Sequence, residues 1–461
     1  MSSPYIPNDN PEIISDMLKE IGVEGIEDLY TDIPREIILR EDLKLPPGET
    51  EDAVKRLIEE KLEKNLTHRD IKVFLGGGVW IHHVPSVVHH LISRGEFLTS
   101  YTPYQPEMSQ GLLQVLFEYQ SMICELTGME VANCSMYDWG SGAAEAILMS
   151  SRVKRRFKAL VAGNISPQRM EVMKTYIEPA EIKIERVPIE AETGGINIEK
   201  LQEALDEEVC SVYIENPSYI GSIEEKVEEI SDVVHEVDAL FIVGVDPLSL
   251  GILKPPGEYG ADVVVGEGQP LGSGVYFGGP LLGIFAAMGD MGIVRQMPGR
   301  IIGMTQTQDG SRRAFSMILQ TREQHIRRER ATSNICTNEA LTAVAAALYL
   351  SLMGKRGFRR LAEALAYRSV YAAHRLSSEA GVMAPPYEYS HFRDFIVRVP
   401  RKLPVGDLLR KGLERGFILG YPVDPYFPQY ENSFLTSFSE IHSRDDIEEF
   451  VGLVREIVEE A

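Results

Sequence analysis

Lysine is missing from one long stretch of this chain of 461 residues. None occurs from Pro255 to Gly354, although lysine and arginine together number 46 in the whole chain. A side chain that forms a Schiff base and also moves protons must be a lysine amine. Such chemistry is therefore excluded from this stretch.

Cysteine and long apolar runs are also scarce. The four cysteines are scattered without a Cys-x-x-Cys pair, so neither a disulfide framework nor a zinc site is expected. His82, His83, His89 and His90 have no carboxylate at ligand spacing, so we expect helix-surface or capping positions and no metal. No run of about 18 uncharged apolar residues occurs, and the N-terminus has no apolar leader segment. We expect a cytoplasmic protein without a membrane span.

The charge balance is strongly acidic, with a formal net charge of -23 and a sequence pI near 5.0. Such a surface repels phosphate backbones and anionic lipids, so neither nucleic acid nor a membrane is an expected partner. Arginines nevertheless gather between Arg312 and Arg330. They could attract anionic groups, but ion pairs with Glu323 and Glu329 are the favoured interpretation.

The order of patterns predicts an arm and two domains. The arm, residues 1–65, has a helix capped by Asn10 that ends at Gly22, and a second helix from Thr50 to about Asn65. It is too small for a core of its own, so it must pack on another surface, such as a subunit.

Residues 66–337 alternate apolar runs with helical segments, among them a helix over 223–237, and predict a large α/β domain with a mostly parallel sheet. A long helix after Thr337, ending at Gly354, leads into a smaller C-terminal α+β domain, residues 338–461. The predicted strands cover 159–162, 182–187, 209–214, 240–245 and 261–265.

Three positions follow the pattern of a coenzyme site. Ser141 lies in a Gly-Ser-Gly turn before a helix, which suits a phosphate but also fits a plain capped helix. Asp246 follows the apolar run 240–245, where a carboxylate could pair with the ring nitrogen of pyridoxal phosphate; a turn-forming Asp-Pro is equally compatible. The Schiff-base lysine would follow the next strand, but Gln269 stands there. Lys254 precedes that strand in a proline-rich turn, and we expect it to be solvated.

A proline-pinned loop precedes the helix that starts near Gly111. Tyr101, Tyr104 and Gln105 offer two phenols and an amide that could orient a small substrate or line a cleft between subunits. A packed loop whose tyrosines bond to backbone has nearly equal weight.

Several of these segments together resemble subunit 1 of the two-subunit glycine dehydrogenase (decarboxylating), the P-protein of the glycine cleavage system. The resemblance extends over most of the chain. After the Gly-rich turn the family usually reads close to Ala-Tyr-Asp-His-Tyr, whereas this chain has Val79-Trp80-Ile81-His82-His83, which puts a role for that turn in doubt. The matching segments are Tyr5-Ile6-Pro7, 17–23, 32–34, 74–78, 99–107 and 320–338.

The resemblance implies a pyridoxal-phosphate fold type I (aspartate aminotransferase-like) large domain, a smaller C-terminal domain and an N-terminal helical arm. It also implies that pyridoxal phosphate is held by the partner, glycine dehydrogenase subunit 2, which carries the Schiff-base lysine. The assembly would decarboxylate glycine and pass the aminomethyl group to the lipoyl arm of H-protein. On this basis we expect Tyr101, Tyr104, Gln105, Thr332 and Asn334 to support the active site, and Ser141, Asp246 and Gln269 to be vestigial.

Two alternatives stay open at this point. The chain could be a self-sufficient pyridoxal-phosphate amino-acid decarboxylase that uses a lysine elsewhere, or a non-catalytic regulatory homologue. Coenzyme covalently attached to the isolated chain would favour the first, and a faster rate on mixing with a lysine-bearing homologue would count against the second.

Overall fold

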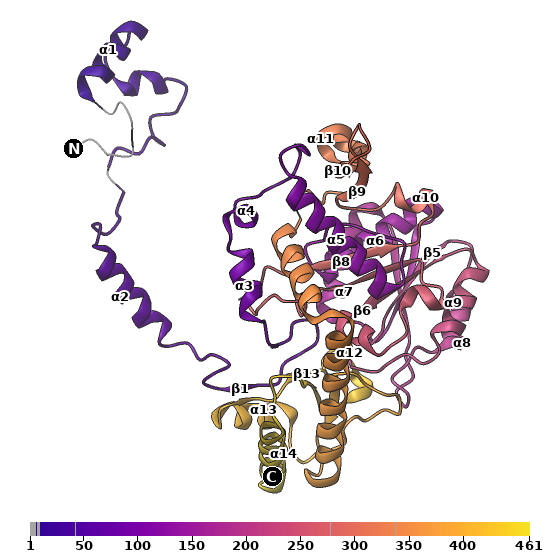
Figure 1. Ribbon diagram of the computed structural model, residues 1–461. Helices are drawn as coiled ribbons and strands as arrows, with labels where there is room; N and C mark the ends of the chain where they lie inside the picture. Colours follow the sequence, from indigo (N-terminus) through magenta and orange to yellow (C-terminus); the bar gives the residue numbers. More distant parts are fainter. Residues whose placement is uncertain (1–5, 7–9, 42, 277, 337) are drawn as a thin grey trace. The chain divides into compact units, whose positions relative to one another are not determined.

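The structure is a computed structural model that describes residues 6, 10–41, 43–276, 278–336 and 338–461 (Figure 1). Tyr5 and Pro7 of the first matching segment, and Thr337 at the predicted domain boundary, lie outside the described residues. The chain divides after Leu66 into an N-terminal unit and a unit of residues 67–461.

The N-terminal unit contains the two predicted helices. Helix α1 (Pro11–Ile21) is capped by the Asn10 side chain and ends at Gly22, whose φ of 84° is left-handed. Helix α2 (Glu51–Leu62) is capped by Thr50. Both predictions are confirmed, although α2 ends slightly early. None of the described residues of this unit is buried, so the apolar faces of both helices have no cover within it.

A seven-stranded, mostly parallel sheet forms the centre of the second unit. Its five parallel strands were predicted from apolar runs. Such runs are expected in strands that are buried on both faces of a sheet. The strand β8 runs antiparallel between β7 and β2. In order across the sheet the strands are β2 (Val131–Ala132), β8 (Gly283–Ala287), β7 (Val263–Glu267), β6 (Leu240–Val245), β5 (Val209–Glu215), β3 (Lys158–Ala162) and β4 (Lys183–Val187).

Helices cover this sheet and complete the large lobe. Helix α6 (Trp139–Lys154) packs across β5 to β8, while α5 (Gln110–Thr127) packs on β2 and β8. A hairpin of β9 (Ile301–Gln306) and β10 (Arg313–Ile318) packs against α5. The remaining helices are α3 (Ser86–Ile92), α4 (Gly95–Leu98), α7 (Pro167–Ile177), α8 (Ile198–Ala204), α9 (Val227–Glu236), α10 (Met291–Val294) and α11 (Gln324–Arg327).

Of two predicted helix bounds, one is wrong and one is confirmed. Helix α9 starts four residues later than predicted, and the backbone N–H groups of Ile223 and Glu224 ahead of it donate to Ser390 O and the Asn216 side chain. The helix expected to end at Gly354 does end there: Gly354 is non-helical, with φ 56° and ψ 173°, and a second helix follows at once, so that α12 (Ala340–Glu379) consists of two helices joined at a kink. Glycine adopts this conformation without a Cβ clash, so the chain turns and resumes the helix.

The C-terminal lobe has its own hydrophobic cluster. It combines the second half of α12 with a small antiparallel sheet and two helices, and Phe74 from the start of the unit inserts into it. Figure 1 shows these orange and yellow segments gathered at one end of α12. They are β11 (Asp394–Arg398), α13 (Val405–Glu414), β13 (Tyr421–Pro422), β14 (Ser433–Ser437) and α14 (Arg444–Glu459), and β12 (Phe417–Ile418) pairs with β1 (Lys72–Val73). Across the described residues, no helix is long and apolar enough to cross a membrane.

His442 gives this lobe a pH dependence. Its Nδ1 accepts the Ser439 N–H at 2.9 Å, its Nε2 lies 3.0 Å from Val73 O, and its ring stacks on Phe74. Burial lowers the pKa of His442 to about 4 from 6.5. Because the unfolded chain takes up a proton near pH 6.5 and the folded chain does not, this group destabilises the fold as pH falls from 6.5 to about 4.

We expect His442→Gln to lose this acid sensitivity, since an amide can make both bonds without titrating. Relative to the variant, the wild-type free energy of unfolding should fall by about 3 kcal/mol between pH 7 and pH 4. Urea unfolding at a series of pH values measures it. Parallel pH profiles for the two proteins would contradict the assignment.

Candidate functional site

Asp246 lies at the end of β6, and its carboxylate forms an ion pair with another side chain of the same chain. Arg393 Nε donates to Asp246 Oδ2 at 2.6 Å, and both side chains are buried. Asp246 also accepts the Leu248 N–H at 3.1 Å, as a turn-forming Asp-Pro does. Burial raises the pKa of Asp246, while the Arg393 guanidinium opposes the rise. The carboxylate that would face a pyridinium nitrogen therefore already has a cationic partner.

Gln269 follows β7, where the order of the fold places the Schiff-base lysine. Its Oε1 accepts the Trp80 N–H at 3.2 Å, and its Nε2 donates to Trp80 O at 3.2 Å and Ser273 O at 3.0 Å. The side chain is completely buried. An amide with all its bonds made in this way fixes the backbone of Trp80 and offers no reactive atom.

The Gly-rich turn and the residues after it reach this same place. The Trp80 ring lies over the Arg393 guanidinium, 3.7 Å from its Cζ, and Trp80 Nε1 donates to Asp394 Oδ1 at 2.9 Å. His82 precedes α3 in a loop and is mostly shielded, with Nδ1 3.0 Å from Trp80 O. The prediction of a helix-surface position is wrong for His82, because the indole draws this segment inward. Burial lowers the pKa of His82.

The start of α6 carries two carboxylates. Asp138 Oδ1 accepts the Ser141 N–H at 2.6 Å, and Ser141 Oγ accepts the Asp138 N–H at 3.1 Å. Glu267 Oε2 accepts the Trp139 N–H at 3.3 Å. Burial raises the pKa of Glu267 to about 7. Two of the backbone donors at this helix start, those of Trp139 and Ser141, thus already bond to carboxylates, which repel a phosphate.

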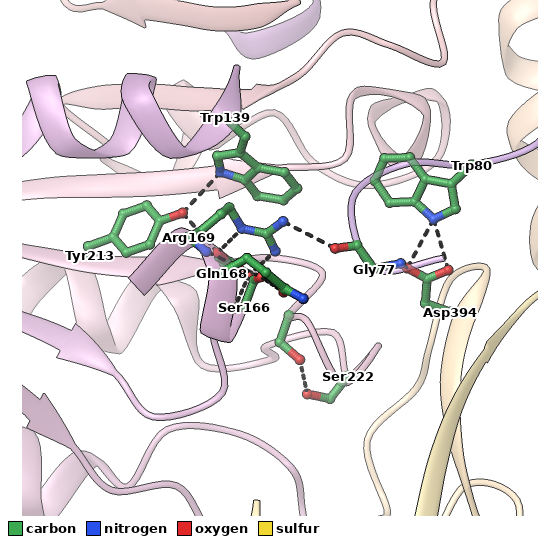
Figure 2. Close-up of polar contacts among 11 residues, drawn as sticks. Gly77, Trp80, Trp139, Ser166, Gln168, Arg169, Tyr213, Ser222 and Asp394 are labelled. Carbon is green, nitrogen blue, oxygen red and sulfur yellow. Dashed lines mark hydrogen bonds and ion pairs between the residues drawn. The ribbon is translucent and has the colours of Figure 1, made fainter. Parts of the chain in front are cut away.

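A second guanidinium lies on the other side of the turn, as Figure 2 shows. Arg169 forms a bidentate pair with Glu215, with both contacts at 2.6 Å, and its Cζ lies 3.9 Å from the Trp139 ring centroid. Arg169 Nη1 donates to Gly77 O at 3.2 Å. Tyr213 OH donates to Glu215 and accepts the Trp139 indole N–H, both at 3.0 Å. The chain has two tryptophans, and each covers a buried arginine.

These contacts leave no room for the coenzyme ring. The cavity beside Asp246, lined by Trp80, Trp139, Arg169 and Arg393, measures about 20 Å³, enough for one water but not for a six-membered ring. A larger cavity of about 460 Å³ adjoins the Gly-rich turn and the start of α6, but Asp246 does not line it. The residues present do not fit pyridoxal phosphate.

The five predicted support residues lie elsewhere, and none of them lines either cavity. Tyr104 OH accepts Arg300 Nη2 at 3.0 Å, Arg300 lies 3.5 Å from Glu323, and the Tyr104 ring contacts His325. The two longest matching segments, 99–107 and 320–338, therefore meet through a buried ion pair. Sequence separation alone could not show this.

Thr332 and Asn334 are bonded within segment 320–338, whereas Tyr101 and Gln105 lie on the loop that contains Tyr104. Thr332 N–H donates to Arg322 O at 3.0 Å, and Asn334 Oδ1 accepts Gln324 Nε2 at 2.7 Å. Tyr101 is 72% exposed, and Gln105 is exposed as well. The structure thus brings Tyr104, Thr332 and Asn334 to one surface, with Tyr101 and Gln105 on the adjoining loop.

The arginine-rich segment is less neutralised than predicted. Glu323 pairs with Arg300 and His325, and Glu329 pairs with Arg330 at 3.8 Å. Arg322 is buried and donates to backbone carbonyls, including Gly299 O at 3.0 Å. The other arginines of this segment are exposed, and within the described ranges they form no ion pair: Arg312, Arg313, Arg327 and Arg328. For these four residues the prediction of ion pairing with Glu323 and Glu329 is wrong.

Two remaining expectations concern metal binding and the environment of Lys254. Within the residues that the structure describes, no group of three or more His, Cys, Asp or Glu side chains is placed to hold a metal ion. Lys254 is exposed and pairs with Glu228 at 2.7 Å, as its position in a surface turn predicted.

Sequence reasoning missed Trp80, Arg169, Glu215 and Arg393. A usable signal existed for Trp80, since tryptophan is rare in this chain and this one stands where the segment departs from the family pattern. The arginines and Glu215 carried no local signal, because each acquires its meaning from a partner at least 46 positions away.

Comparison with known proteins gives a consistent result. Residues 3–451 match the family described as Glycine cleavage system P-protein. A probable glycine dehydrogenase (decarboxylating) subunit 1 from Staphylothermus marinus is 50% identical over 473 residues, covering 100% of this chain and 99% of the relative.

Solved structures agree with this match. A crystal structure of glycine decarboxylase (P-protein) of the glycine cleavage system, in inhibitor-bound form, superposes with a TM-score of 0.87 at 39% identity, covering 99% of this chain and 100% of that chain. Glutamate decarboxylase from Lactobacillus brevis has a TM-score of 0.68 at 11% identity over 92% of this chain and 96% of that chain, which shows a shared fold alone. The predicted pyridoxal-phosphate fold type I is confirmed. From its full-length similarity and its fold, the chain belongs to the glycine cleavage system P-protein family.

Proposed function

We propose that this chain is the subunit of a two-subunit glycine dehydrogenase (decarboxylating) that does not hold the coenzyme. The observation that carries the proposal is the filled coenzyme position, in which Arg393 neutralises Asp246 and Gln269 replaces the lysine. Pyridoxal phosphate then belongs to glycine dehydrogenase subunit 2. Together the subunits decarboxylate glycine and transfer the aminomethyl group to the lipoyl arm of H-protein. The cytoplasmic location stays a prediction.

The surface of the two long matching segments is the proposed contact with subunit 2. It combines exposed apolar side chains, such as Tyr101 and the adjoining Met108, with arginines that have no acidic partner in the described part of the chain. Aromatic, methionine and arginine side chains are those enriched at protein interfaces. In this arrangement Tyr101, Tyr104, Gln105, Thr332 and Asn334 would face the partner's site rather than the filled one. The apolar faces of α1 and α2, which have no cover within their own unit, supply a second contact.

Mixing the subunits tests the proposal. We expect the isolated chain to show no glycine-dependent CO2 exchange with lipoylated H-protein, and full activity to appear when subunit 2 is added. Activity of the isolated chain, with coenzyme attached to it, would instead identify a self-sufficient decarboxylase. A complex whose rate does not depend on this chain would leave only a regulatory role.

Tyr104→Phe tests the proposed surface. The substitution removes the acceptor of the Arg300 guanidinium at 3.0 Å and releases the loop from the Arg300–Glu323 pair. We expect the rate of the two-subunit complex to fall about 10-fold without dissociation, which is the scale of one charge-assisted hydrogen bond. Activity assays and size-exclusion chromatography measure the two effects. Tyr367→Phe, an exposed tyrosine on α12, is the matched control, and equal rates for both variants would remove Tyr104 from the surface.

A further inference from the structure

The Gly-rich turn is bonded on both sides, to different lobes. Gly77 N–H donates to Asp394 Oδ2 of β11 at 3.1 Å, and Gly77 O accepts Arg169 Nη1 of α7 at 3.2 Å. A Cβ at Gly76 would lie 2.4 Å from Asp394 Oδ1. Only glycine therefore permits the backbone to enter between the two charged side chains. One peptide unit bridges the C-terminal lobe and the large lobe.

Trp80 and Arg393 make the same bridge with their side chains. The Trp80 indole belongs to the core of the large lobe, yet its Nε1 donates to Asp394 at the start of β11. Arg393, one residue earlier, reaches back to Asp246 at the end of β6. The stacked indole and guanidinium lie between these two bonds at 3.7 Å. Arg393 and Trp80 are both at most 3% exposed, so water does not compete for these contacts.

The charged side chains at this junction bond across the two lobes, although Arg393 Nη1 and Nη2 have no hydrogen-bond partner among the described residues. Asp394 accepts from Gly77 and Trp80, and Asp246 accepts from Arg393. At the exposed edge of the junction, His83 adds a bond from its backbone N–H to Glu440 Oε1 at 2.7 Å. Charge-assisted hydrogen bonds away from water are the strongest polar contacts available to a protein. In each of these bonds one partner lies in the part of the chain up to Asp246, and the other lies in the part from Arg393 onward.

We propose that Gly77, Trp80, Arg393 and Asp394 form a clamp that takes the place of the coenzyme as the bridge between the lobes. The clamp holds the C-terminal lobe closed against the large lobe without any ligand. This chain therefore presents one rigid surface to subunit 2 through the whole reaction. The proposal rests on the proposed function in one respect, that no coenzyme occupies this chain.

Hydrogen–deuterium exchange of the full chain, alone and in complex with subunit 2, tests the clamp. In Trp80→Phe the ring remains but the indole bond to Asp394 is lost, and we expect amides of 392–398 to exchange about 10-fold faster. Trp139→Phe is the matched control. It also loses an indole bond and keeps a ring over an arginine, but within the large lobe, and should leave 392–398 unchanged.

Two results would overturn the clamp. One is equal exchange of 392–398 in both variants. The other is slower exchange of 392–398 in the wild-type chain after pyridoxal phosphate and glycine are added, since ligand would then close the lobes. Failure of the proposed function has a different readout, a mass increase of the intact chain from attached coenzyme, so the two failures are distinguishable.

Discussion

Replacing Arg393 by Met is expected to lower the free energy of unfolding by about 3 to 5 kcal/mol, the cost of leaving one member of a buried ion pair alone. Asp246 is buried and would lose its cationic partner at 2.6 Å. The indole of Trp80 would also lose its stacked guanidinium. Urea unfolding followed by circular dichroism measures the loss, as a shift of the first transition if the lobes unfold separately.

The pH dependence of this variant has a defined sign. Burial already raises the pKa of Asp246, and Arg393 opposes the rise, so removing Arg393 raises that pKa further. The folded variant then keeps a proton that the unfolded chain has released, and its stability falls as pH rises above the unfolded value near 4. The deficit relative to wild type should be smaller at pH 5 than at pH 8.

Two further variants make the Arg393 experiment decisive. Arg401→Met removes an exposed arginine that pairs with Glu431 at 3.5 Å, and should cost at most about 0.5 kcal/mol. The double variant Asp246→Asn/Arg393→Met should be more stable than Arg393→Met alone, because no unpaired charge is buried. If Arg393→Met is no less stable than Arg401→Met, the ion pair does not support the fold.

The second of the two main predictions concerns Gln269→Lys. We expect this variant to bind almost no coenzyme. The substitution supplies the amine that the chain lacks, yet the neighbouring cavity holds about 20 Å³ and Asp246 remains bound to Arg393. The helix start is already satisfied by Asp138 and Glu267. The amine alone therefore restores one of three requirements. Incubation with pyridoxal phosphate, borohydride reduction and intact-mass analysis should show no more label than for wild type.

A surface lysine gives the background for this labelling. Gln114→Lys lies on the exposed side of α5, where its amide contacts Glu118, and should label as much as Gln269→Lys. Stoichiometric labelling confined to Gln269→Lys would mean that the coenzyme position is not filled as described. The triple change with Trp80→Gly and Arg393→Met opens the cavity and removes the competing cation, and should label more than the single variant.

The helices and strands were largely predictable because their signals are local. Asn10-Pro11 and Gly22 bound α1, and apolar runs locate β3 to β7, since burial on both faces selects such runs. The failures were also physical. Gly354 ends the first helix of α12 as predicted, but the second helix that follows at once depends on packing in a further hydrophobic cluster. Ahead of α9, the N–H groups of Ile223 and Glu224 donate to Ser390 and Asn216, contacts that no local pattern predicts.

The candidate site was predictable in position but not in content. The order of strands placed Ser141, Asp246 and Gln269 near one edge of the sheet. It could not show that Arg393, 147 positions after Asp246, would reach it. A residue whose role is set by a distant partner carries no periodicity, spacing or propensity that a sequence reading can use.

The sequence by itself determined that this chain has no amine where its fold requires one, because the presence of a lysine at a position is a covalent fact. Only the tertiary structure decided what stands there instead. Arg393 pairs with Asp246, and Trp80 contacts both Gln269 and Arg393, because the folding of two lobes around one sheet brings them together. Burial selects partners inside the protein for the Gln269 amide, the Trp80 indole and Arg393 Nε, while Arg393 Nη1 and Nη2 have no hydrogen-bond partner among the described residues.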